Sequence, residues 1–340
     1  MVSGIPVSLL QLVFSDSLTA PCYHLVSDDP PAHVRSLFAC QRPAEFERDL
    51  DFLLKRYRVV SLNDLHQSAR TGRPLPKNSL FLSFDDGYRE SIDLIAPVLL
   101  RKGAPATFFL TTAFLDNRVL GYRHKASLLV ARSEEEGIQR AAAIVREICQ
   151  KSRVPSVELP PREFFLSRKY PETAILDVCA EELGVSFDDY LAKAQPFLTS
   201  DEVRKLLDYG FTVGGHSVDH PLYAGLPLEQ QVAQTRDCLA FLIQSFKLRT
   251  KAFAFPFVSD GVDRRFYDAM FAEGVADLIF CIGAVPEGRE PRVVERFGVE
   301  TAVRMGIRER LRGEYSRRLT RRLAGHFPHS APVAQGAQIV

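Results

Sequence analysis

The sequence lacks the patterns that mark several classes of protein. Its six cysteines show no Cys-x-x-Cys spacing, which argues against a zinc ribbon and leaves no clear disulfide framework. Lys and Arg number 43 against 42 Asp and Glu, so the net charge of +1 supplies no overall field for nucleic acid or an anionic membrane. The apolar stretch at residues 5–14 follows no positively charged segment and is too short to span a membrane. We therefore expect a cytoplasmic protein with reduced cysteines, in preference to a secreted or periplasmic one.

What the sequence does contain is an alternation of short apolar runs and helical patterns. Residues 80–84 and 106–111 are both apolar runs, and the segment between them has helical spacing. Units of strand, helix and strand join parallel strands through right-handed crossovers, so we expect a parallel sheet covered by helices. The length of 340 residues suits one catalytic domain of the size of an α/β barrel.

The middle of the chain departs from this alternation. Between Asp116 and Pro196 the patterns indicate helices and no convincing strand. The candidate helices are residues 125–131, 134–151, 171–183 and 187–194. Loops at the C-terminal face of a barrel are the usual place for insertions, and functional sites lie at that face. We therefore interpret this part as a lid over such a site.

The end of the chain is different again. Residues 306–340 hold an arginine-rich stretch and then a tail of Pro, Ala, Gln and Gly that is too polar to pack. We predict a catalytic domain at residues 1–305, with its insertion at about 116–196, followed by a basic helix and a flexible tail at 306–340. A solvated helix is the simplest interpretation, and weak binding to a membrane or another anionic partner is the alternative.

Two adjacent carboxylates follow the apolar run at residues 80–84. Asp85 and Asp86 end it abruptly, as happens where a buried parallel strand delivers acids to a site at its C-terminal end. Neighbouring side chains on a strand point in opposite directions, but a turn at Gly87 lets both carboxylates approach one centre. Either aspartate alone could cap the next helix instead. A cap would account for only one of them.

A pair of histidines lies far along the chain. His216 and His220 are four residues apart, a spacing that places both imidazoles on one side of a helical turn, and two glycines before them allow close backbone approach. Joined to the carboxylate of Asp86, they make a set of two histidines and one carboxylate with open positions. Such a set suits a catalytic zinc or a similar divalent ion.

The two motifs together resemble those of a known family. The run Ser-Phe-Asp-Asp-Gly at residues 83–87 and the run His-Ser-Val-Asp-His at residues 216–220 are similar to the first and second signature motifs of the polysaccharide deacetylases. These metal-dependent enzymes remove N- or O-acetyl groups from sugars. The resemblance extends over about residues 21–300, apart from a divergent middle. It implies an α/β fold, a distorted and incompletely closed (β/α) barrel with mostly parallel strands.

The resemblance also implies roles for particular residues. It assigns a divalent metal to the set of one aspartate and two histidines, with zinc favoured over cobalt, nickel or manganese. Asp85 would be the catalytic base. The stretch Phe255-Pro256-Phe257 would meet the substrate, with the backbone N–H of Phe257 stabilising the oxyanion.

Two parts of the family pattern are missing from this chain. The third motif usually carries an arginine that orients the base, but residues 252–257 contain none. Arg89, Arg123 and Arg296 are candidates for that role on chemistry alone, and the sequence does not rank them. The general acid is the second missing part.

A histidine on a late strand should supply the acid, yet none occurs between His220 and His326. His24 is our candidate, because it ends the first predicted strand, and the first and last strands of a nearly closed barrel are neighbours. A packed histidine bonded to a backbone carbonyl is the alternative for His24. His124, in the insertion, is the next candidate for the acid.

We therefore predict a hydrolase of C–N bonds other than peptide bonds, which removes acetyl from an N-acetylated sugar or polysaccharide precursor. An amidase-like hydrolase of a small non-sugar amide is one alternative. A non-catalytic carbohydrate-binding protein is the other, although a protein that only bound metal would not need Asp85 beside the ligand Asp86. The expected partner is an N-acetylated carbohydrate, with no nucleic acid and no transmembrane segment.

Overall fold

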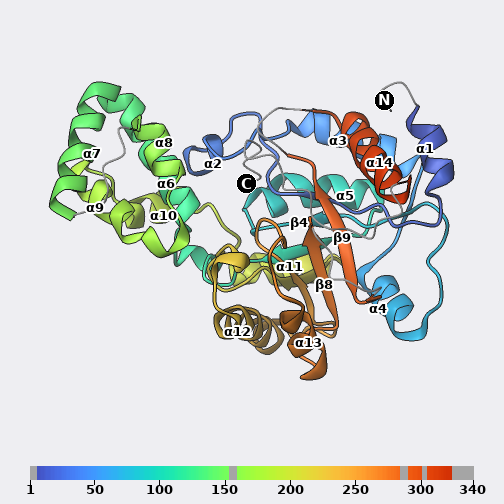
Figure 1. Ribbon diagram of the computed structural model, residues 1–340. Coiled ribbons are helices and arrows are strands. Elements are labelled where there is room, and N and C mark those ends of the chain that lie inside the picture. The colour runs from blue at the N-terminus through green and yellow to red at the C-terminus, as the bar shows by residue number, and fades with distance from the viewer. Residues whose placement is uncertain (1–5, 153–158, 284–289, 301–304, 324–340) are drawn as a thin grey trace.

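The computed structural model describes residues 6–152, 159–283, 290–300 and 305–323. Seven strands of the described residues form a closed barrel in which every neighbouring pair is parallel (Figure 1). In order around the barrel they are β1 (Pro21–Tyr23), β4 (Ser83–Phe84), β5 (Thr107–Leu110), β6 (Thr212–Gly215), β7 (Ala252–Ala254), β8 (Leu278–Ile282) and β9 (Val293–Gly298). The predicted α/β barrel is confirmed. The predicted gap is absent, because β1 pairs with β4 on one side and with β9 on the other.

Aromatic side chains fill the barrel. The ring of Phe280 on β8 lies 5.0 Å from the rings of both Phe81 and Phe109, measured between centroids. Phe108, the neighbour of Phe109 on β5, points the other way and packs against Phe211 outside the barrel. Adjacent strand residues face opposite sides, so the run Phe108-Phe109 serves two layers of the core at once.

One predicted strand is divided in two. Residues 80–84 were expected to form a single strand, but β3 (Ser79–Leu80) pairs with β2 (Arg58–Val59) in a separate two-stranded sheet. Only β4 enters the barrel. The chain between β3 and β4 places Phe81 in the barrel core, so the apolar run spans two sheets.

Helices surround the barrel. They are α1 (Val7–Val13), α2 (Ala32–Arg35), α3 (Pro43–Leu54), α4 (Leu62–Thr71), α5 (Ala96–Lys102), α11 (Ser200–Asp208), α12 (Leu228–Phe246), α13 (Arg264–Ala272) and α14 (Ile307–Leu323). All six cysteines are buried, and their thiols are reduced, as expected. None of the helices in the described part of the chain is long and apolar enough to cross a membrane.

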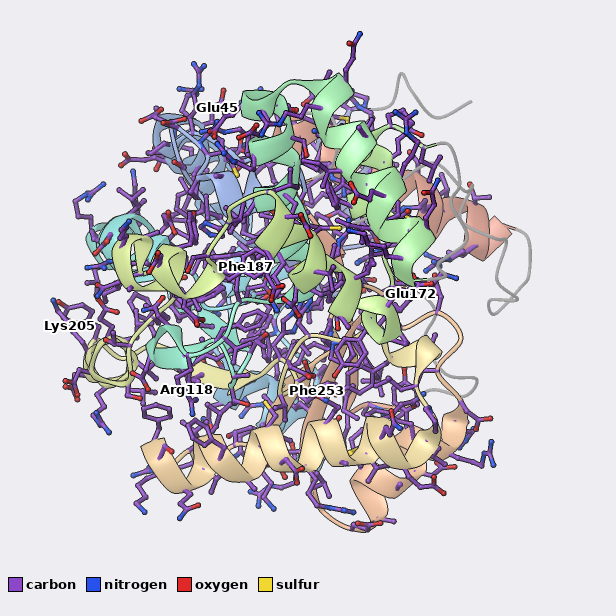
Figure 2. The ribbon with its side chains drawn as sticks, turned by 90° about the vertical axis from the view of Figure 1, so that its left-hand side faces the viewer. Glu45, Arg118, Glu172, Phe187, Lys205 and Phe253 are labelled. Atoms are coloured by element: carbon purple, nitrogen blue, oxygen red, sulfur yellow. The ribbon has the colours of Figure 1, made fainter. Side chains whose placement is uncertain are left out.

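The middle of the chain forms a group of helices beside the barrel (Figure 1). These are α6 (Tyr122–Glu136), α7 (Ile138–Ser152), α8 (Pro161–Leu166), α9 (Ala174–Glu182) and α10 (Phe187–Ala194). Their apolar faces share one hydrophobic cluster with loops of the barrel, through Phe38, Phe114 and Phe197. In the view of Figure 2 the insertion, marked by Glu172 and Phe187, lies above, and α12 lies below.

The arginine-rich helix is less solvated than the sequence suggested. Ile307, Leu311 and Tyr315 of α14 are buried in the main core. The Tyr315 hydroxyl lies 3.1 Å from Thr19 Oγ1 and 2.7 Å from the Tyr57 hydroxyl. Every fourth residue from Ile307 to Tyr315 thus faces the barrel, and Arg310 contacts it as well, through the Gly298 carbonyl. Residues 324–340, the predicted flexible tail, lie outside the described residues.

Candidate metal centre and catalytic site

The two aspartates of the first motif separate at a backbone turn. Asp86 has φ of +71° and Gly87 has φ of +77°, so the left-handed turn begins at Asp86, one residue before the glycine. The side chains of Asp85 and Asp86 therefore face different partners, and both are buried. Neither caps the following helical segment, where no side-chain cap is present. A non-glycine residue in this backbone region costs free energy, as is common at functional sites.

The histidines of the second motif lie on a loop and not on a helical turn, which corrects the sequence interpretation. They follow β6, and Ser217 and His220 both have positive φ, +69° and +66°. The Ser217 hydroxyl accepts the His220 N–H at 2.9 Å and holds this compact loop. Gly214 is needed because a Cβ there would lie 2.6 Å from the Phe109 ring.

Asp86, His216 and His220 nevertheless converge as predicted. Asp86 Oδ1 lies 3.0 Å from His220 Nε2 and 3.4 Å from His216 Nε2. Two ligands of one ion at about 2.1 Å, at a tetrahedral angle, are roughly 3.4 Å apart. These three side chains form the one group of potential metal ligands found within the described ranges.

The chemistry of the three ligand atoms fits a divalent ion. His216 Nδ1 donates to the Ala254 carbonyl at 2.9 Å, so its lone pair is at Nε2, facing Asp86. Burial lowers the pKa of His216 to about 4, which keeps the imidazole neutral, as a metal ligand must be. Asp86 Oδ1 is buried and has no hydrogen-bond partner. A buried carboxylate oxygen without a donor is costly unless a cation occupies its lone pair.

Asp85 is paired with an arginine from the far end of the chain. Arg296 on β9 donates two hydrogen bonds to the carboxylate, at 2.7 and 2.8 Å, and a third to Ser83 Oγ at 3.0 Å. Burial opposes the ionisation of Asp85, but the Arg296 guanidinium outweighs burial and holds the pKa of the carboxyl below its usual value. Asp85 is thus ionised and fixed in orientation.

The structure separates the three candidate arginines. Arg89 donates to Asp93 and Gln195 at the surface, and Arg123 donates to the Leu166 carbonyl in the insertion. Only Arg296 reaches Asp85. Its guanidinium is buried and lies 5.0 Å from the Phe109 ring, which packs against its face.

His24 is held by a carboxylate that the sequence analysis missed. Glu300, just after β9, accepts the His24 backbone N–H at 2.8 Å and its ring Nδ1–H at 3.2 Å. Burial by itself lowers the pKa of His24, but the hydrogen bond to Glu300, with the charges of Glu300, Asp86 and Asp85, raises it to about 9. His24 is therefore protonated at neutral pH. The sequence signal for Glu300 was weak, because it is only an acidic residue at the end of the strand that was predicted to lie beside the strand of His24.

Aromatic residues of the insertion pack towards Phe257, whose ring contacts the potential ligand His220. Phe257 has φ of +57°, and its ring lies 4.6 Å from the ring of His220. The ring centroid of Tyr122 lies 6.4 Å from that of Phe257, and the ring centroid of Tyr170 lies 6.0 Å from that of Tyr122. The Tyr170 hydroxyl donates to Asp219, inside the second motif, at 2.5 Å. Pro256, which precedes Phe257, is buried, whereas Phe257 is half-buried. The insertion is thus tied to the loop that carries both histidines.

His124 occupies a different position from the one proposed for a second acid. It is 3 % exposed, and its Nε2 lies 2.7 Å from the Tyr88 hydroxyl. Burial holds the pKa of His124 well below its ordinary value, so the ring is neutral and has no acidic proton to give at neutral pH.

Comparisons with known proteins give one family match and several similar folds. The family described as polysaccharide deacetylase matches residues 72–160, which include the first motif. A search of curated proteins found no match. Among solved structures, the deacetylase PplD of Streptococcus pyogenes, in complex with acetate, is 14 % identical with a TM-score of 0.51, covering 83 % of this chain and 91 % of its own. IcaB of Ammonifex degensii is 17 % identical with a TM-score of 0.51, covering 84 % and 92 %. At this identity the likeness shows a shared fold.

Proposed function

We propose that this chain, whose residues 72–160 match the polysaccharide deacetylase family, is a metal-dependent hydrolase that removes acetyl from an N-acetylated sugar or polysaccharide precursor. The observation that carries this proposal is the group of three potential ligands with a base and an acid beside it: Asp85 Oδ2 lies 3.9 Å from His216 Nε2, and the charges of Asp85 and Asp86 help to raise the pKa of His24. Amide hydrolysis needs a base and an acid at once, and such a site supplies both. The acetate bound to PplD is the product that this reaction would release.

Asp86, His216 and His220 would hold the ion, which we propose to be zinc. A bound divalent ion supplies a Lewis acid that polarises the acetyl carbonyl and makes water more acidic. The protein's own contribution is to keep the His216 imidazole neutral and to leave Asp86 Oδ1 without a competing donor.

Asp85 would accept the proton of the attacking water. Arg296 occupies both of its oxygens, which fixes the plane of the carboxylate and keeps it ionised. The remaining lone pairs of those oxygens are the ones available to the water. A base held in this way loses little orientation entropy when it acts.

His24 would donate its proton to the leaving nitrogen. As the C–N bond breaks, the amine takes the proton and leaves as a neutral group, and acetate keeps the oxygen of the water. Glu300 holds the ring by Nδ1, so Nε2 is the nitrogen that can face the substrate. The backbone N–H of Phe257, next to His220, would stabilise the oxyanion.

The test is release of acetate by the full chain loaded with zinc. N-acetylated amino sugars, as monomers and oligomers, are compared with simple N-alkyl acetamides, and acetate and free amine are both measured. We expect equal amounts of the two products from at least one sugar, and a loss of about a hundredfold or more in Asp85→Asn. Asp93→Asn, an exposed aspartate paired with Arg89, is the matched control.

Three results would contradict the proposal. Acetate released only from the simple amides would favour the amidase. Binding of sugar with no acetate from any substrate would favour a non-catalytic protein. Equal rates in wild type and Asp85→Asn would remove the base from the mechanism.

A further inference from the structure

Among the described residues, one side of α1 is both apolar and exposed. Val7 and Leu10 face the main core and are buried. Leu9, Leu12 and Val13 lie on the other side, and they are 54 %, 71 % and 53 % exposed. Positions three and four apart share one face of a helix, so these three side chains form a single patch. A lone exposed leucine is ordinary on a protein surface, but contiguous apolar patches often mark interaction sites.

Positive charge gathers beside this patch. The neighbouring helix, α14, contains seven arginines and two glutamates, although the whole chain has a net charge of only +1. The Phe14 ring, just after α1, stacks on the Tyr315 ring of α14 with 5.5 Å between centroids, so the two helices are in contact. Figure 1 shows both helices at the opposite end of the molecule from the insertion. The charge of the chain is thus unevenly distributed, with a positive excess beside α1.

Arg56 and Arg308 link the patch to the basic helix. The Gln11 side chain on α1 donates to the Arg56 carbonyl at 2.8 Å. The guanidinium groups of Arg56 and Arg308 lie over the same ring, that of Phe52, at 4.0 and 4.6 Å from its centroid. Both arginines are exposed, and no carboxylate of the described residues forms an ion pair with either. Their charges are therefore available to an anionic partner.

The other exposed charges around the patch are mostly positive as well. The Asn78 N–H donates to the Ser15 carbonyl at 2.6 Å, which brings Lys77 to the end of α1, where it lies 3.9 Å from Asp16. An exposed pair of this kind contributes little. In α14 and in residues 55–58 and 77–78, the exposed cations are Lys55, Arg56, Arg58, Lys77, Arg308, Arg317 and Arg322, and the exposed acids beside them are Asp16 and Glu309. These cations and the three apolar side chains of α1 form what we call the basic-apolar face.

We propose that the basic-apolar face docks the protein on the surface of an anionic lipid membrane. The three apolar side chains of α1 enter the boundary between headgroups and acyl chains, and the surrounding cations meet the lipid phosphates. A nucleic acid backbone would pair with the cations but leave the apolar patch in water, so the combination favours lipid. This face lies apart from the metal group, and the inference does not rest on the proposed function.

The experiment measures binding of the full chain to lipid vesicles by co-sedimentation. Vesicles made of equal parts phosphatidylglycerol and phosphatidylcholine are compared with vesicles of phosphatidylcholine alone. We expect binding to the anionic vesicles at about 0.1 M salt, and loss of that binding at about 1 M salt, where charges are screened over a much shorter distance. The neutral vesicles should bind at least about tenfold more weakly, because the cations contribute nothing there.

Two double variants test the two halves of the face. Leu9→Ser/Leu12→Ser should bind the anionic vesicles about tenfold or more weakly than wild type, because less apolar surface leaves water. Arg56→Gln/Arg308→Gln should lose about 25-fold, at about fivefold for each cation, whereas Arg56→Lys/Arg308→Lys should keep most of the affinity. All four residues are exposed, so the fold should tolerate these changes.

Matched controls carry the same changes elsewhere. Ile138→Ser alters a residue of the insertion that is 63 % exposed, and Arg204→Gln alters an exposed arginine of α11. Both should bind the anionic vesicles as wild type does. The chain contains no tryptophan, so Leu12→Trp places a single reporter in the face. Its fluorescence should shift to shorter wavelength on the anionic vesicles, whereas that of Ile138→Trp should not.

Several outcomes would overturn the proposal. Wild type that stays in solution with both kinds of vesicle, or binds both equally, would remove the anionic membrane as the partner. Unchanged binding in Leu9→Ser/Leu12→Ser would place the contact on another surface. Duplex DNA that displaces the vesicles and binds this variant as tightly as wild type would assign the face to nucleic acid. A dimer in solution that the same variant dissociates, without vesicle binding, would assign it to a second copy of the chain.

Discussion

In the proposed mechanism, Glu300 sets the pH range in which His24 can serve as the acid. Its carboxylate is the main contact that raises the pKa of His24 to about 9, against the effect of burial. Glu300→Gln removes that charge, so the pKa should fall. The basic limb of kcat/KM should then move from near pH 9 to a lower pH, because His24 loses its proton earlier. We expect a large loss of rate at pH 8 and a smaller one at pH 6.

The measurement is a pH profile of kcat/KM for wild type, Glu300→Gln and His24→Ala. His24→Ala should lose the basic limb and about a hundredfold to ten-thousandfold in rate, with zinc content unchanged. Glu290→Gln is a suitable control, since Glu290 pairs with Arg292 near the start of β9. A basic limb that stays in place in Glu300→Gln would show that another group is the acid.

The sequence could predict Asp85, Asp86 and the two histidines because each pair lies in one short run. The sequence did not separate Arg296 from the other two candidate arginines, and it did not indicate Glu300 at all. Arg296 is 211 residues from Asp85, and Glu300 is 276 residues from His24. Nothing in the local sequence marks which arginine or which acid will meet a given partner. Only the pairing of β1 with β9 brings them together.

At the scale of elements, β9 carries Arg296 from inside the barrel to Asp85, the proposed base. Lysine is a point charge and cannot occupy both carboxylate oxygens as the guanidinium does. In Arg296→Lys we therefore expect kcat to fall by about 100-fold with little change in KM, because a misplaced base reacts slowly. The pKa of Asp85 should rise towards its ordinary value, which moves the acidic limb of the profile to higher pH.

Steady-state kinetics across pH tests this expectation. Arg310→Lys is the control, because Arg310 donates to the Gly298 carbonyl at the end of the same strand and does not touch Asp85. An unchanged kcat in Arg296→Lys would show that the base does not need two-point fixation.

Helices and strands were predictable where a periodic pattern ran without interruption. The bounds of α12 and β8 are those that amphipathic and apolar spacing indicate. The pattern failed at residues 216–220, where the spacing of four suggested a helical turn. Left-handed backbone at Ser217 and His220 prevents that turn, and the apolar spacing rules contain no signal for it.

For the whole molecule, the potential ligands join two distant loops, one after β4 and one after β6. An ion bound only by the folded state should stabilise it, by about 2.7 kcal/mol at a free concentration of 100 times Kd. We expect Tm to rise by a few degrees when zinc is added to stripped protein. His216→Ala should show no such rise, whereas His66→Ala, a histidine of α4 outside the metal group, should respond as wild type does. Thermal unfolding followed by circular dichroism measures both.

The closure of the barrel by β9 has a consequence for the time during synthesis at which the site becomes complete. A nascent chain that has emerged from the ribosome as far as β8 already carries Asp86, His216 and His220. It carries neither Arg296 nor Glu300, so its base and its acid have no partners. The contacts that hold Asp85 and His24 are therefore complete only once the last strand has closed the barrel.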